Sequence, residues 1–147
     1  MSRPLAPFFA WPTSLAAAAL LAGCAVSAPA TRSDELTCVL STNCASSVAS
    51  GSLPPLRYRG SAADGMRALR DALAQFPEAQ VVAGDTLWVQ TIFTTTVGFR
   101  DQVDFVIDPD GQKIDYRSRS LFGLFDFNKN RSRMREIAKR FAAVAPR

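Results

Sequence analysis

Four arginines and one asparagine near the C-terminal end of the chain are the residues best suited to binding chemistry. They are Arg117, Arg119, Asn130, Arg131 and Arg133. A guanidinium group matches two oxygens of a phosphate or carboxylate at once, and the free N–H groups at a helix start favour anions. The pattern predicts a cleft for an anion, such as a lipid headgroup, a cell-wall carboxylate or a nucleotide-like group. Two alternatives stay open: pairing of the arginines with aspartates inside the fold, and nonspecific attraction to an anionic membrane.

The positive charge of the protein is concentrated in this same segment. The whole chain has 17 basic and 13 acidic residues, for a net charge of +4. Between Lys113 and Arg140 there are nine cations and three anions. Basic charge alone is weak evidence for nucleic-acid binding, and we expect no nucleic-acid partner.

The sequence contains no histidine, which removes the Ser-His-Asp and Cys-His nucleophile systems. Acid–base chemistry would therefore fall to carboxylates, lysine or tyrosine. Asp101 and Asp104 are the candidate catalytic acids of the alternative function, a carboxylate-dependent hydrolase of the cell envelope. A turn accounts for Asp108 and Asp110, and an outward strand position accounts for Asp104 and for Asp115. We expect no metal site and no cofactor.

A glycine-centred apolar segment lies between the paired arginines. Five of its seven residues are large and apolar: Leu121, Phe122, Leu124, Phe125 and Phe127. The main prediction is that they close the end of the core between the last strand and the last helix. The alternative is an exposed patch or the mouth of a site for an acyl chain.

The N-terminus has the form of a secretory signal. Arg3 precedes an alanine-rich apolar stretch that is shorter than the roughly 20 residues of a membrane-spanning helix. The stretch ends in Leu21-Ala22-Gly23-Cys24, which resembles the bacterial lipobox. This resemblance implies cleavage before Cys24, lipidation of Cys24, and an anchor in the outer membrane facing the periplasm.

Two further cysteines remain, Cys38 and Cys44. In an oxidising compartment a disulfide is the default for such a pair. Two thiols without histidine do not complete a tetrahedral zinc site. We therefore divide the chain into a signal peptide (1–23), a lipidated tether with a short disulfide loop (24–53) and one domain (54–147).

The periodicity of the domain predicts the order β-α-β-β-β-β-α. Ser61 begins a helix, with Asp64 placed to complete a capping box, and the apolar stripe Met66, Leu69, Leu73 and Phe76 follows. The short stretch 55–60 before this helix is the candidate first strand. After the helix, β-rich sequence predicts strands over 79–84 and 86–97, and alternating residues predict strands over 103–107 and, after a turn at 108–111, over 112–120. A final helix covers 130–144, capped by Asn128 or Asn130, with a buried stripe that consists of Met134, Ile137, Ala138, Phe141 and Val144. The fold class is α+β, a curved antiparallel sheet with two helices on one face. The helix-grip folds, the TATA-binding-protein-like one above all, are similar.

Four stretches of the chain resemble, in order, an uncharacterised family catalogued as domain of unknown function 1499. The matching residues are Asn43, Cys44, Ser46 and Ser47; Asp101, Val103, Asp104 and Phe105; Arg117, Ser118 and Ser120; and Asp126, Asn130, Arg131 and Arg133. The likeness runs from Cys38 to Phe141. It implies domain limits and marks residues, but no mechanism.

The leading hypothesis is a membrane-anchored envelope lipoprotein that is not an enzyme. It would be a binding or assembly module for an anionic or amphiphilic partner. The predicted partners are the membrane, through the lipid anchor, and an anionic lipid or other envelope component, with a protein partner as the alternative.

Overall fold

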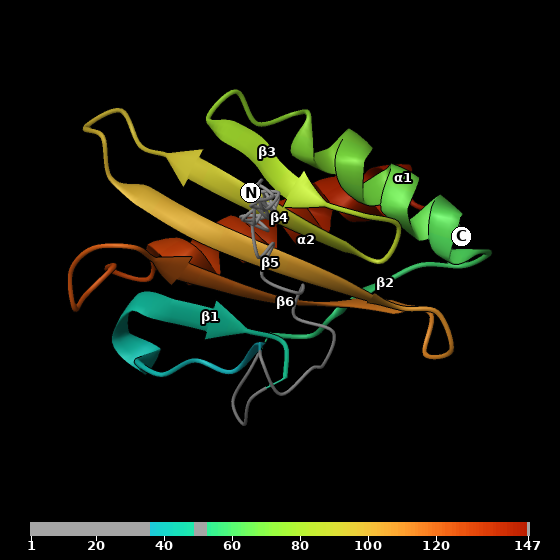
Figure 1. Ribbon diagram of the computed structural model, residues 1–147, viewed down its shortest axis with the longest axis horizontal. Coiled ribbons are helices and arrows are strands. Elements are labelled where there is room, and N and C mark those ends of the chain that lie inside the picture. The colour runs from blue at the N-terminus through green and yellow to red at the C-terminus, as the bar shows by residue number, and fades with distance from the viewer. Residues whose placement is uncertain (1–35, 49–52, 147) are drawn as a thin grey trace, which may run out of the picture.

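The computed structural model describes residues 36–48 and 53–146. It is an α+β fold, in which an open antiparallel sheet of six strands carries two α-helices (Figure 1). In chain order the elements are a 3-10 turn η2 (Ser41–Asn43), β1 (Cys44–Ser46), β2 (Leu56–Arg57), α1 (Ala62–Leu73), β3 (Ala79–Gly84), β4 (Trp88–Thr94), β5 (Arg100–Asp108), β6 (Lys113–Ser120) and α2 (Lys129–Val144).

The strands lie in the order β1-β6-β5-β4-β3, and β2 also pairs with β6. The registers place Val89 beside Phe105 and Phe105 beside Tyr116. Because side chains alternate between the two faces of a strand, this row fixes which residues of β4, β5 and β6 face the helices. The alternation expected from the sequence is confirmed.

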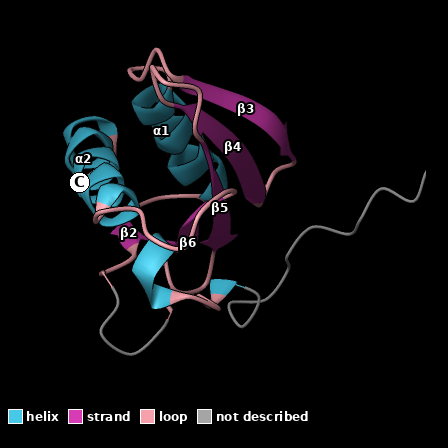
Figure 2. Cartoon of the chain, turned by 90° about the vertical axis from the view of Figure 1, so that its left-hand side faces the viewer, coloured by secondary structure: helices cyan, strands magenta, loops and turns pink. Residues whose placement is uncertain are grey.

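Both helices cover the same face of the sheet (Figure 2). The core between the two layers takes its side chains from all the long strands and from both helices. Its fully buried members include Val89, Phe93, Phe105, Tyr116 and Leu69. Burial of these apolar side chains is the main stabilising term of such a two-layer fold.

Helix α1 begins as the sequence predicts. The Ser61 hydroxyl accepts a hydrogen bond from the Asp64 backbone N–H, and the Asp64 carboxylate accepts one from the Ser61 N–H. This reciprocal capping box satisfies two of the donors that a helix start leaves open. The hydrogen bonds from Ser61 lower the pKa of Asp64 to about 2, with the Arg67 side chain contributing further.

Helix α2 starts differently from the expectation. Asn128 occupies the cap position but makes no side-chain cap bond, and its φ of 63° lies in the left-handed region. The Asp126 carboxylate takes the capping role instead, accepting from the N–H groups of Asn128 and Asn130 at 2.9 and 2.8 Å. The end of the predicted stripe is also corrected, because Val144, the last residue of the helix, is exposed.

The folded unit begins earlier than Pro54, the boundary predicted from the sequence. Residues 44–46, assigned to the tether, form β1 and pair with Arg117–Arg119 of β6. Leu36 is fully buried, and its carbonyl accepts a hydrogen bond from the Ser46 hydroxyl. The short strand lacks a readable alternation, so only its partner β6 reveals it. The signal peptide and Cys24 lie outside the described residues.

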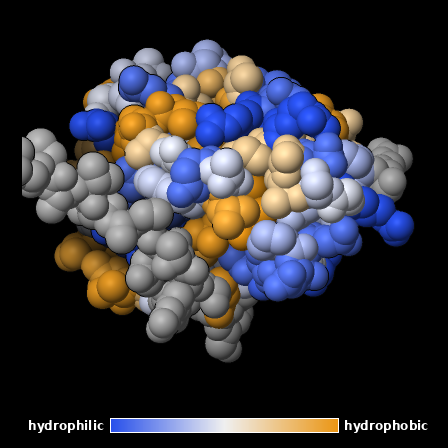
Figure 3. All heavy atoms as spheres, turned by 45° about the vertical axis from the view of Figure 1, so that its right-hand side comes forward, coloured by the Kyte–Doolittle hydropathy of each residue, from blue (hydrophilic) through white to orange (hydrophobic). Residues whose placement is uncertain are grey.

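The predicted disulfide is present between Cys38 and Cys44, with Cα atoms 5.8 Å apart. On the side of the molecule turned forward in Figure 3, hydrophilic and hydrophobic residues alternate over short distances. Within 36–48 and 53–146, no helix combines the length and the apolar character needed to cross a membrane.

Candidate functional site

The five residues predicted to form an anion site do not lie together. Arg117 and Arg119 alternate with Tyr116 and Ser118 along β6 and point to the face of the sheet away from the helices. Asn130 and Arg133 project from α2, which packs on the opposite face. The sheet therefore separates the two halves of the predicted cleft.

On the face away from the helices, Arg117 forms an ion pair with Asp104 across the β5–β6 register. The Arg117 Nη2 atom lies 2.9 Å from the Asp104 Oδ2 atom, and Asp104 is buried. The side-chain amides of Gln90 and Gln102 also donate to this carboxylate. Arg119 is exposed and donates to the Gln102 amide oxygen at 3.2 Å.

On the helix-covered face, Arg133 is buried and bonded to Asp101. Its Nη2 atom lies 2.5 Å from Asp101 Oδ2, and its Nη1 atom donates to Asn130 Oδ1 at 3.0 Å. The guanidinium carbon also lies 4.9 Å from the centre of the Phe93 ring, within cation–π range. A buried charge pair of this kind needs such additional bonds to offset its desolvation.

Asn130 links this pair to three other segments. Its side-chain oxygen accepts from the Ser118 hydroxyl at 2.6 Å. Its side-chain nitrogen donates to the Asn43 carbonyl at 2.9 Å and to the Asp126 carboxylate at 2.8 Å. We call Asp101, Ser118, Asp126, Asn130 and Arg133 the buried polar network. Its hydrogen bonds join β5, β6, the start of α2 and the disulfide loop, so its function is architectural.

Arg131 is half-buried on α2, on the opposite side of the sheet from Arg117 and Arg119. Its positive charge acts on Tyr116, whose pKa is raised mainly by burial and is partly lowered by Arg131. The Tyr116 hydroxyl donates to the Pro54 carbonyl at 3.1 Å. Arg131 therefore lies on the helix-covered side of the sheet, the side of Tyr116, apart from Arg117 and Arg119.

The two candidate catalytic acids cannot act as a pair. Asp101 and Asp104 are three residues apart on β5, so their side chains point to opposite faces of the sheet. Each is bonded to an arginine, Arg133 in one case and Arg117 in the other. Within the described part of the chain, no group of three or more His, Cys, Asp or Glu residues could hold a metal ion.

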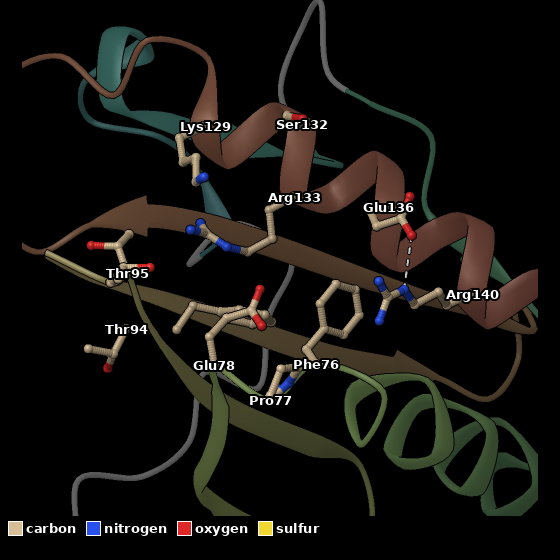
Figure 4. Close-up of a pocket in the computed structure, with 12 residues that line it drawn as sticks. Phe76, Pro77, Glu78, Thr94, Thr95, Lys129, Ser132, Arg133, Glu136 and Arg140 are labelled. Atoms are coloured by element: carbon tan, nitrogen blue, oxygen red, sulfur yellow. Dashed lines mark hydrogen bonds and ion pairs between the residues drawn. The ribbon is translucent and has the colours of Figure 1, made fainter. Parts of the chain in front are cut away.

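A cleft of about 680 Å³ lies between α2, the end of α1 and the end of β4 (Figure 4). Three of its five charged side chains are engaged in ion pairs. Arg140 donates to Glu136 at 2.9 Å, which lowers the pKa of Glu136, and its guanidinium carbon lies 3.8 Å from the centre of the Phe76 ring. Arg133 is bonded to Asp101 behind the cleft. An anionic ligand would have to displace these contacts, so the cleft is the weaker candidate.

The glycine-centred segment after β6 is exposed and does not close the core. Phe122, Phe125 and Phe127 expose 77%, 68% and 96% of their surface. The prediction that they plug the end of the core is therefore wrong, and its alternative, an exposed patch, is what the structure has. The core is already closed at this end by the buried polar network and Phe93.

Two other loops add apolar side chains at the same end of the molecule. The β4–β5 turn contributes Val97 and Phe99, and the disulfide loop contributes Val39 and Leu40, all exposed. The rings of Phe99 and Phe122 stack with centroids 6.4 Å apart. We call the following nine residues the apolar end: Val39, Leu40, Val97, Phe99, Leu121, Phe122, Leu124, Phe125 and Phe127.

Hydrogen bonds hold the three loops of the apolar end together. The Thr42 hydroxyl donates to the Leu124 carbonyl at 2.5 Å, and the Asn43 side chain donates to the Gly123 carbonyl at 2.7 Å. The Leu121 N–H donates to the Arg100 carbonyl at 3.0 Å. The first two bonds join segments about 80 residues apart in the chain, and the third joins the two strand ends, so the apolar end is a defined surface.

Phe127 occupies a backbone conformation that a bulky residue rarely adopts. Its φ is 51° and that of Asn128 is 63°, both in the left-handed region. Such a conformation costs a non-glycine residue about 1–2 kcal/mol. The fold therefore holds the most exposed phenylalanine of the chain's described part at a strained position, and strain of this kind concentrates at functional sites.

Cations surround the apolar end. Arg100, Arg119 and Lys129 are exposed at the ends of β5 and β6 and at the start of α2. In the three loops and these flanking positions the only acid is Asp126, whose carboxylate already accepts hydrogen bonds from Asn128 and Asn130. This end of the molecule is therefore both apolar and positive.

A family model described as Protein of unknown function (DUF1499) matches residues 34–141. The chain belongs to this family. The match begins before β1, in agreement with the earlier start of the folded unit, and includes the sheet and most of α2. No curated protein and no solved structure matches the chain.

Seven of the 15 residues that carried the DUF1499 resemblance belong to the buried polar network or are hydrogen-bonded to it. Asn43, Asp101, Ser118, Asp126 and Arg133 come from four separate stretches and meet beneath the first turn of α2. The sequence located them one stretch at a time, but the pairing of β5 with β6 and the packing of α2 bring them together. Their shared role here is to join the sheet, the helix and the disulfide loop.

The apolar residues outside the glycine-centred segment were missed from the sequence. Val97 and Phe99 flank a glycine between two strands, where a turn is usually polar. Val39 and Leu40 lie within a six-residue disulfide separation that leaves no room to bury them. Large apolar residues at turn positions where they cannot be buried are the sequence signal that could have predicted these exposed side chains.

Proposed function

We propose that this DUF1499 protein is a lipid-anchored binding module of the bacterial cell envelope, with an anionic amphiphile as its partner. It is anchored through Cys24 in the outer membrane, facing the periplasm, and it is not an enzyme. The binding surface is the apolar end together with Arg100, Arg119 and Lys129, rather than the five-residue cleft expected from the sequence.

The observation that carries the proposal is the coincidence of exposed phenylalanines and exposed cations at one end. Large apolar patches are uncommon on proteins that stay alone in solution and mark sites of interaction. The nearby cations favour a partner that presents phosphate or carboxylate groups beside apolar chains. An amphiphile with an anionic headgroup has both properties in one molecule.

The hydrolase alternative has no observation in its favour. Asp101 and Asp104 lie on opposite faces and each is bonded to an arginine, whereas acid–base catalysis by carboxylates needs two groups on one substrate. The finer fold assignment, a helix-grip arrangement of the TATA-binding-protein kind, remains our proposal. Two helices on one face of an antiparallel sheet support it.

The test is a titration of the soluble form, Ala25–Arg147, with short-chain phosphatidylglycerol below its micelle concentration, followed by native mass spectrometry. We expect a discrete complex that Arg119→Gln and Lys129→Gln each weaken. Arg59→Gln is the matched control, because Arg59 is exposed beside the β5–β6 turn at the opposite end and its loss changes net charge equally. Equal binding by all three variants, or no complex with any protein together with no binding to anionic vesicles, would reject the proposal.

A further inference from the structure

We infer that the partner of the apolar end is the surface of the anionic leaflet that holds the lipid anchor, on which the domain rests with its loop tips inserted. This inference rests on the proposed function and names the physical form of its partner. It concerns an orientation of the whole domain against a bilayer, rather than the capture of one molecule.

The shape of the apolar end favours a surface over a single bound molecule. Small ligands bind in concave sites that bury most of their area. Here the phenylalanines lie at loop tips, and Phe127 exposes 96% of its surface. The hollow beside them is lined by apolar residues and by Arg117 and Arg119. Its volume of about 270 Å³ is smaller than that of most small-molecule sites. Projecting apolar side chains can instead enter the boundary between headgroups and acyl chains.

The loops are arranged so that their tips can enter this boundary together. The stacked rings of Phe99 and Phe122 belong to different loops, and the bonds from Thr42 and Asn43 fix the disulfide loop to Leu124 and Gly123. All three loops project from the same end of the sheet (Figures 1 and 2). A set of tips held in fixed relation loses little conformational freedom on insertion, which favours binding.

The charges agree with an anionic leaflet. Arg100, Arg119 and Lys129 flank the tips, and each cation near such a surface strengthens binding roughly fivefold. The turns at the opposite end of the sheet carry Asp85, Asp108 and Asp110. Arg57, Arg59 and Lys113 lie beside the β5–β6 turn and balance these acids. An anionic surface therefore attracts the apolar end, with its uncompensated cations, more strongly than the opposite end.

The length of chain before the folded unit fits this arrangement. Eleven residues lie between Cys24 and Leu36, and the twelve steps from one to the other span at most about 40 Å in a fully extended chain. Leu36 is two residues before Cys38, where the disulfide loop with Val39 and Leu40 begins. A short tether holds the apolar end at a high effective concentration beside the leaflet, so even weak surface binding orients the domain.

The experiment uses the unlipidated form Ala25–Arg147, which keeps every strand, both helices and the disulfide. Its co-sedimentation is measured with vesicles of phosphatidylglycerol and phosphatidylcholine in equal parts, and with vesicles of phosphatidylcholine alone. We expect binding to the anionic vesicles that weakens with added salt. Replacement of Phe122 and Phe125 by Ser and of Phe127 by Gly should lower the partition coefficient roughly tenfold per residue, which is the order expected for partial burial of a phenylalanine.

The matched control is Val82→Ser, because Val82 is an exposed apolar residue of β3 outside the apolar end. Its partition coefficient should equal that of the original protein. As a direct probe of insertion, the tryptophan fluorescence of Phe127→Trp should shift to shorter wavelength when anionic vesicles are added. Brominated acyl chains in the vesicles should quench this fluorescence. Analytical ultracentrifugation without vesicles tests the other occupant of the surface, a second copy of the chain.

The outcomes separate the two proposals. Vesicle binding that the triple variant loses and Val82→Ser keeps supports the inference. A complex with short-chain phosphatidylglycerol but no binding to vesicles overturns the inference and leaves the proposed function standing. No binding in either assay rejects both. Dimerisation that the triple variant abolishes, without vesicle binding, assigns the surface to a second copy and overturns the inference.

Discussion

Breaking the buried ion pair between Arg133 and Asp101 is the sharpest test of the architectural role of the buried polar network. The side chains are 7% and 5% exposed, and the bond between Nη2 and Oδ2 is 2.5 Å long. Arg133→Met keeps much of the aliphatic length of the side chain but leaves the Asp101 carboxylate buried without its cation. Removing one partner of a buried pair costs about 3–5 kcal/mol, a large part of the stability of a small domain.

The structure indicates that this cost falls on Asp101 rather than on the rest of the network. Asn130 Oδ1 still accepts from the Ser118 hydroxyl after the substitution, and Asn130 Nδ2 still donates to Asp126. Asp101→Asn alone leaves a buried guanidinium without its carboxylate and is also destabilising. In the double variant neither charge is present, so we expect its loss to fall short of the sum of the single losses by about 2–4 kcal/mol.

The assay is equilibrium unfolding in urea of the original protein, the two single variants, the double variant and Arg135→Met. Arg135 is exposed on the same helix, and its substitution should change the free energy of unfolding by less than about 0.5 kcal/mol. Additive losses in the double variant would refute the argument that the pair is desolvated and coupled. A stable Arg133→Met that loses short-chain phosphatidylglycerol would instead assign Arg133 to a ligand site.

Three further predictions concern other parts of the molecule. Phe127→Gly should leave the free energy of unfolding unchanged or raise it by up to about 1 kcal/mol, because glycine adopts the φ of 51° without strain; a clear loss in urea unfolding contradicts the strain argument. The pKa of Asp64 is lowered in the folded protein, so the ionised carboxylate stabilises the fold fully at pH values above its ordinary pKa of 3.8. This contribution disappears as the pH falls through about 2. The difference in free energy of unfolding between the original protein and Asp64→Asn should therefore shrink between these pH values, and a constant difference argues against the prediction. Replacing Cys38 and Cys44 by serine should lower the free energy of unfolding by about 2 kcal/mol, which is the loop-closure contribution of so short a loop. Reductant should have no further effect on this variant. An unchanged unfolding midpoint would show that the rest of the fold already orders the loop.

Much of the fold could be predicted from local sequence. The stripe from Met66 to Phe76 and the Ser61–Asp64 capping box specify α1, because both depend on residues three and four apart. The alternation along β5 and β6 specifies which side chains face the helices, because the period of a strand is two. The start of the fold at β1 could not be predicted, because a three-residue strand acquires its pairing only from β6.

The candidate site, in contrast to the fold, could not be predicted from local sequence. The sequence pointed to Arg117 and Arg133 as one cluster because they are close along the chain, whereas β6 and α2 place them on opposite faces of the sheet. Likewise, an apolar run such as Leu121–Phe127 has the same composition in a core as on a surface. Its exposure is decided by whether other side chains already fill the space beneath it, and that depends on contacts between distant segments.

By itself, the amino-acid sequence determined the chemical inventory of this protein: no histidine, a localised excess of arginine and lysine, a cysteine pair and an apolar segment beside the cations. It also determined the elements whose periodicity is local. Only the tertiary structure decided which arginines are bonded inside the fold and which stay on the surface, and that three loops join into one apolar, positive end. Both are set by strand register and by the packing of α2, which depend on contacts among residues far apart in the chain, and a local pattern does not contain that information.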